Sequence, residues 1–113
     1  MLTPVSLAAP QRVDIALLDL QVGVLANHSM NYLVSGTPPK RMGNAHPNIV
    51  PYREFATADG NLTVAVGNDG QFRRLVEVLG RGDLADDPAY ATNEARVHNR
   101  VQLEAILAER IGQ

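Results

Sequence analysis

Residues 41–72 read RMGNAHPNIVPYREFATADGNLTVAVGNDGQF, and this stretch decides the fold of the chain. Its first part, 43–48, combines side-chain amides, an imidazole and backbone N–H groups in one short polar loop. Proline restricts the backbone angle φ, so Pro47 and Pro51 stiffen this loop without making it apolar. A loop that is both stiff and polar is typical of a surface that holds a ligand.

Two strand-like runs, 52–57 and 62–66, follow the loop and are separated by residues 58–61, ADGN. Their β-branched and aromatic residues favour strands, and an Asp-Gly pair supplies the positive φ of a tight hairpin turn. We therefore predict a β-hairpin with Gly60 in the left-handed region of backbone conformation. A second polar turn, 68–71, then leads into a helix.

The longest apolar region predicts a helix over 13–34, although alternating residues leave a short strand open at its entry. Its apolar side chains spread around the cylinder, whereas a surface helix needs only one apolar stripe. Such a helix requires packing partners, either a second copy or a further domain. Gly36 fits a left-handed cap, and Pro38 and Pro39 prevent the helix from continuing.

The C-terminal part predicts two helices. Apolar residues from Phe72 to Leu79 fall at helical spacing, and Gly80 ends the run. After a turn-rich segment at 83–90, Thr92 or Asn93 can cap a helical turn that leads into a final amphipathic helix.

The fold class is therefore α+β, with a long N-terminal helix, a linker loop, a β-hairpin sheet and two C-terminal helices. We expect a loose tail at 1–12, the helix at 13–34, the linker and polar loop at 35–51 and a small α+β domain at 52–113. A chain of 113 residues suits one modest core.

Composition excludes several classes of function. A net charge of −2 and scattered basic pairs give no footprint for nucleic acid. The chain contains no cysteine, so it has no disulfide, thiolate nucleophile or zinc–thiolate site, and three scattered histidines do not form a metal site. Polar residues interrupt 13–34, which argues against a membrane span, and the first ten residues make a poor signal peptide. A cytoplasmic location fits these features.

Several separated segments resemble the family III CoA-transferases, a group that includes formyl-CoA transferase, carnitine CoA-transferase and α-methylacyl-CoA racemase. The segments occur in the family's order and cover nearly all of the chain from Gln11 onward. They are Gln11–Asp19, Gly43–Asn48, Tyr52–Gly60, Val66–Phe72 and Asp87–Arg96. The resemblance implies the last helix of a large Rossmann-like domain, a linker and most of a small domain.

This resemblance implies a parent enzyme that transfers CoA between carboxylic acids through an aspartyl-CoA thioester. CoA thioesters are then substrates, and no tightly bound cofactor is expected. The family's catalytic aspartate lies upstream of the segment that Gln11–Asp19 matches, so we assign no catalytic residue and expect the isolated chain to be inactive. Asp14 is better interpreted as a cap or turn residue than as a nucleophile, and Asp19 likewise as structural.

The resemblance also implies partners, namely an acyl-CoA, a carboxylic acid, and a second copy or a large domain bound through the 13–34 helix. Two alternatives to a CoA-transferase fragment remain open. In the first, the chain is a fragment of an acyl-CoA racemase. In the second, the chain is a non-catalytic interaction or oligomerisation module.

The resemblance places the polar loop where the family has a mobile glycine-rich loop over its active site. The substrate-binding candidates there are Gly43, Asn44, Ala45, His46, Pro47 and Asn48. This loop carries fewer glycines than that of the family, so we expect it to be stiffer. A plain linker turn explains the same residues. His46 has no orienting partner visible in the sequence and is not assigned to catalysis.

Asp69 is the last candidate. It matches a position at which the racemase carries an acidic residue near its active site. The alternative is that Asp69 caps the helix that begins near Gln71, where the helix dipole favours a negative charge.

Overall fold

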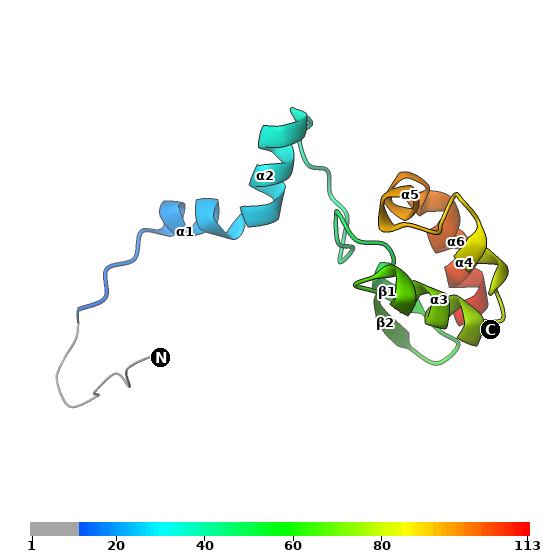
Figure 1. The fold of residues 1–113 in the computed structure, drawn as a ribbon. Helices are drawn as coiled ribbons and strands as arrows, with labels where there is room; N and C mark the ends of the chain where they lie inside the picture. Colours follow the sequence, from blue (N-terminus) through cyan, green and yellow to red (C-terminus); the bar gives the residue numbers. More distant parts are fainter. Residues whose placement is uncertain (1–11) are drawn as a thin grey trace, which may run out of the picture. The chain divides into compact units, whose positions relative to one another are not determined.

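The computed structural model describes residues 12–113, and the chain divides into two units between Pro39 and Lys40 (Figure 1). The first unit contains two helices, α1 (Leu17–Val24) and α2 (Ala26–Ser35). The second contains a two-stranded sheet and four helices.

The helical region expected over 13–34 is divided at Leu25, and residues 13–16 precede the first helix. Leu25 ends α1, and its carbonyl oxygen accepts hydrogen bonds from the backbone N–H groups of His28 (2.7 Å) and Ser29 (3.0 Å) in α2. Gly23 and Asn27 lie on either side of the division, and both are weak helix formers. Gly36 has φ 68° and closes α2 as the expected left-handed cap.

The two N-terminal helices bury none of their residues. Leu18 is 75% exposed, Val24 77% and Leu33 73%. The helices therefore keep their apolar side chains available on several sides, as the sequence pattern predicts.

The sheet consists of β1 (Tyr52–Ala56) and β2 (Asn61–Ala65), which pair antiparallel with Tyr52 opposite Ala65 and Phe55 opposite Leu62. The predicted hairpin and the α+β class are confirmed.

The prediction for Gly60 is wrong, because the glycines with positive φ among residues 12–113 are Gly36, Gly43 and Gly80. The four-residue loop 57–60 closes instead through Thr57. Its N–H donates to the carbonyl of Gly60 (2.8 Å), and its hydroxyl donates to the carboxylate of Asp59 (3.0 Å).

The second unit contains more helices than the sequence predicts. They are α3 (Asp69–Val78), α4 (Asp83–Asp86), α5 (Asn93–His98) and α6 (Arg100–Ile111). The segment expected as turns includes the single turn α4. Thr92, one of the two residues predicted as a cap, caps α5 by accepting a hydrogen bond from the N–H of Ala95 (3.2 Å). The polar loop belongs to this unit, which begins at Lys40.

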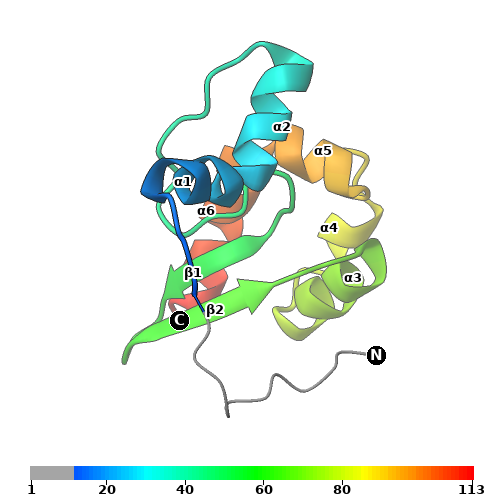
Figure 2. The ribbon, with the colours of Figure 1, turned by 90° about the vertical axis from the view of Figure 1, so that its left-hand side faces the viewer.

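One core fills the second unit between the sheet and the helices, and α6 lies beside β1 (Figure 2). Its buried apolar residues are Val50, Phe55, Val64, Val66, Phe72, Val76, Leu84, Ala85, Tyr90, Leu103 and Leu107. Val50 lies just after the polar loop, so its buried side chain anchors the loop to the core.

Candidate functional site

The polar loop begins at Gly43, whose φ of 63° requires a residue that tolerates the left-handed region. Asn44 then joins the loop to β1. Its amide donates to the Glu54 carboxylate (3.0 Å), and its oxygen accepts from the backbone N–H of Glu54 (3.4 Å). The N–H of Ala45 donates to the carbonyl of Met42 (3.2 Å).

His46 is fixed on two sides. Its backbone N–H donates to the carbonyl of Tyr52 (2.9 Å), and its Nδ1 accepts from the N–H of Asn48 (3.1 Å). The His46 and Tyr52 rings are tilted at 52°, with centroids 5.4 Å apart. Nδ1 of His46 therefore acts as a hydrogen-bond acceptor within the loop.

Three side chains from α5 and α6 bind the backbone of the same loop. The amide of Asn93 accepts from the N–H of Val50 (3.1 Å) and donates to the carbonyl of Asn48 (2.9 Å). Arg96 Nε donates to the carbonyl of Val50 (2.7 Å). Arg100 Nη2 donates to the carbonyls of His46 (2.9 Å) and Pro47 (2.8 Å).

Among the described residues 12–113, Arg96 is the charged residue that is buried, and its side chain has no exposed surface. Besides Val50, its Nη1 donates to the carbonyl of Tyr90 (2.9 Å) and its Nη2 to Asp69 Oδ1 (2.8 Å). Its guanidinium also lies 4.4 Å from the centroid of the Phe72 ring. A buried guanidinium is tolerated only when its donors are satisfied, and here all three nitrogens have acceptors.

The interpretation of Asp69 as the helix cap is wrong, because Asn68 caps α3. The side chain of Asn68 accepts from the N–H of Gln71 (2.9 Å) and leaves Asp69 as the first helical residue. The Asp69 side chain is 57% exposed and pairs with Arg96. Arg96 therefore connects the two polar turns, since it binds the end of the loop and the start of α3.

Sequence reasoning did not identify Asn93, Arg96 or Arg100 as parts of this site. A signal was available, because positions 93, 96 and 100 have the i, i+3, i+7 spacing of one helical face. An arginine on the face that also carries Leu103 is a candidate for a buried, paired charge.

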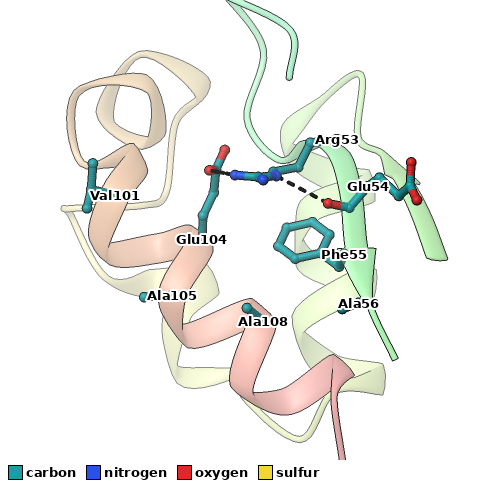
Figure 3. Close-up of a pocket in the computed structure, with 8 residues that line it drawn as sticks. All are labelled: Arg53, Glu54, Phe55, Ala56, Val101, Glu104, Ala105 and Ala108. Carbon is teal, nitrogen blue, oxygen red and sulfur yellow. Dashed lines mark hydrogen bonds and ion pairs between the residues drawn. The ribbon is translucent and has the colours of Figure 1, made fainter. Parts of the chain in front are cut away.

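A groove of 430 Å³ lies between β1 and α6 (Figure 3). Arg53 crosses one end of it, donating to Glu104 (2.6 Å) and to the backbone carbonyl of Glu54 (3.2 Å). The rest of the lining is mainly small and apolar. It consists of Phe55, Ala56, Val101, Ala105 and Ala108.

The described residues 12–113 contain no cluster of His, Cys, Asp and Glu that would hold a metal ion. In the same part of the chain, no helix is both long and apolar enough to cross a bilayer. Two exposed ion pairs flank α4. The hydrogen bond from Arg73 lowers the pKa of Asp86, and the hydrogen bond from Arg81 lowers the pKa of Asp83.

Comparison with known proteins gives a consistent result. The sequence model of CoA-transferase family III matches residues 9–113. A succinate–glutarate CoA-transferase of Agrobacterium fabrum is 61% identical over 87% of this chain and 24% of its own length. A human succinyl-CoA:glutarate CoA-transferase is 44% identical over 87% of this chain and 22% of its own.

The crystal structure of a CAIB/BAIF family protein from Brucella suis resembles the described fold. Its TM-score is 0.67 at 57% identity, over 91% of this chain and 27% of that protein. The chain thus spans about a quarter of the length of the curated relatives that it matches.

Proposed function

The chain belongs to CoA-transferase family III, and from that premise we propose that residues 40–113 form one wall of a site that transfers CoA between two dicarboxylic acids. The observation that carries the substrate class is the 61% identity to a succinate–glutarate CoA-transferase. Succinate and glutarate differ by one methylene group, so one site with fixed polar donors suits both acids.

We propose that the loop residues 43–48 and Asp69 face the substrates. The loop is polar, and several of its backbone groups are fixed by hydrogen bonds, which suits it to orient a carboxylate or a thioester. None of these residues is assigned as the nucleophile. Their proposed work is to orient the acid and to exclude water from a reactive acyl intermediate.

A chimera tests this proposal. In the Agrobacterium fabrum relative, the matched segment is replaced by the corresponding residues of this chain. We expect the chimera to exchange CoA between succinyl-CoA and glutarate, and the 113-residue chain alone to show no exchange above background. A folded chimera with no exchange, beside an active parent enzyme, would contradict the proposal.

A matched control addresses the loop. In a second chimera, residues 43–48 are replaced by six glycine and serine residues. We expect this version to fold and to lose most of its exchange rate, because a flexible loop no longer orients the substrate. Equal rates for the two chimeras would remove the loop from the proposed site.

The exposed apolar helices favour a second, compatible role in association. We propose that α1 and α2 bind a further domain or a second copy, since Leu18, Val24 and Leu33 have large exposed fractions. Sedimentation velocity of the chain over a wide concentration range tests this role. Self-association that disappears in Leu18→Asp and Val24→Asp variants supports binding of a second copy, and a strictly monomeric chain at high concentration contradicts it and leaves a further domain as the partner.

A further inference from the structure

We propose that Asn93, Arg96 and Arg100 are positioning residues that hold the polar loop in one conformation, so that the loop is a fixed wall and not a moving lid. They are named here as the loop clamp. The proposal deepens the proposed function and rests on it in one respect, namely that the loop faces the substrates.

The loop clamp binds backbone atoms almost continuously. Three loop carbonyls, those of His46, Pro47 and Asn48, and the carbonyl of Val50 just after the loop accept hydrogen bonds of 2.7–2.9 Å from its three side chains. The N–H of Val50 adds a fifth bond, to Asn93. Opening the loop away from α5 and α6 breaks all five bonds together, and it also removes the buried Val50 side chain from the core.

The clamp residues are themselves held in place. Arg96 is buried and bound to Tyr90 and Asp69, as described above. Arg100 Nη1 donates to Glu104 Oε1 (3.3 Å), and the other oxygen of Glu104 accepts from Arg53. The Arg53–Glu104 contact is visible at the end of the groove (Figure 3). A support of this kind keeps side-chain donors in position without a ligand present.

The five hydrogen bonds between the clamp and the loop segment described above all involve backbone atoms of residues 46–50. Asn44 binds Glu54, and the His46 ring binds the N–H of Asn48. Different residues therefore position the loop backbone and supply the side chains that the loop presents. The clamp sets where the loop backbone lies, and the loop side chains set what it offers to a substrate.

Hydrogen exchange of the 113-residue chain tests the clamp directly. In Asn93→Ala, the Val50 N–H loses its acceptor, and we expect its exchange to accelerate about tenfold while the amides of β2 change by less than about twofold. Asn93→Asp keeps the acceptor oxygen and should restore most of the protection at Val50. Arg73→Met removes an exposed arginine from α3 and serves as the matched control, with no effect on the loop.

The chimera gives the second readout. Asn93→Ala and Arg100→Met in the chimera should lower kcat by about tenfold or more with a small change in KM, because the substrates still bind while the wall is misplaced. Arg100→Lys should recover part of the rate, and Arg73→Met should leave the rate unchanged.

The outcomes separate the two proposals. Unchanged exchange at Val50 in Asn93→Ala overturns the clamp whatever the chimera does. Faster exchange with unaltered kcat in an active chimera overturns the positioning role and leaves the proposed function standing. An inactive parent chimera counts against the proposed function, whereas protection at Val50 that depends on Asn93 still supports the clamp.

Discussion

Arg96 shows at the scale of one residue how this fold uses a buried charge. Its guanidinium has no exposed surface, and it joins the end of the loop, the segment before α5 and the start of α3. Two of its acceptors are backbone carbonyls in partly or fully buried surroundings, so they have no ready substitute in water. The residue therefore ties together three segments that are distant in the sequence.

Replacing Arg96 with Met should destabilise the second unit by about 3 kcal/mol, because the carbonyls of Val50 and Tyr90 lose their donor. Urea unfolding followed by circular dichroism measures the change in the free energy of unfolding. Asp69→Asn is the matched control and should cost less, about 1 kcal/mol, since Asp69 is half exposed and keeps an acceptor oxygen for Arg96. Equal losses for the two variants would contradict this account.

Acid titration should separate the two exposed ion pairs beside α4. Hydrogen bonds from the arginines place the folded-state pKa values of Asp83 and Asp86 below 3.8. A lowered folded pKa means that the pairs stabilise the fold above the unfolded pKa and lose that contribution as the pH falls through the folded value. The contribution is small because both pairs are exposed.

Carboxyl NMR measures these titrations residue by residue. Arg73→Met should raise the midpoint of Asp86 toward 3.8 and leave that of Asp83 unchanged, because Asp83 is paired with Arg81. A shift of both midpoints would mean that the two pairs are not independent.

At the scale of elements, side-chain capping marks the start of two helices of the second unit, α3 and α5, although the sequence reasoning favoured Asp69 over Asn68 as the cap of α3. Asn68 and Thr92 each accept a hydrogen bond from the backbone N–H three residues later. The hairpin was likewise predictable from its two strand-like runs. The division of the N-terminal helix at Leu25 and the backbone conformation at Gly60 were not predictable, because both depend on how several weak local preferences combine.

Removing the side-chain cap of α3 should lower the free energy of unfolding by an amount typical of N-caps. Asn68→Ala should lower the free energy of unfolding by about 1 kcal/mol, since the N–H of Gln71 loses its acceptor. Thr63→Ala, at an exposed position of β2, is the control and should change stability by less than about 0.5 kcal/mol. Thermal melts of the two variants provide the comparison, and equal shifts would argue against a capping role.

At the scale of the whole molecule, every buried apolar side chain of the described residues lies between Val50 and Leu107. A polypeptide of residues 40–113 should therefore fold cooperatively with a melting temperature close to that of the full chain. The peptide 12–39 alone should show little helix, because α1 and α2 are short and bury nothing. Circular dichroism of both polypeptides decides this, and an unfolded 40–113 would contradict the division into units.

The candidate site was only half predictable. The loop 43–48 is visible in the sequence because Gly, Pro, Asn and His cluster there. The residues that hold it, Asn93, Arg96 and Arg100, lie more than 40 positions away. No local pattern pairs a backbone carbonyl with a distant side chain, so this part of the site requires the folded structure.

The loop clamp has a consequence for how this protein can be altered. Asn93, Arg96 and Arg100 bind the loop through main-chain atoms, which any amino acid except proline provides in full. The Asn44 and His46 side chains also bind Glu54 and the Asn48 N–H, so exchanging them removes those contacts and leaves the five main-chain bonds of the clamp in place. A library randomised at positions 44–46, with the three clamp residues kept, is a route to new acid specificity on a loop whose backbone the clamp still holds.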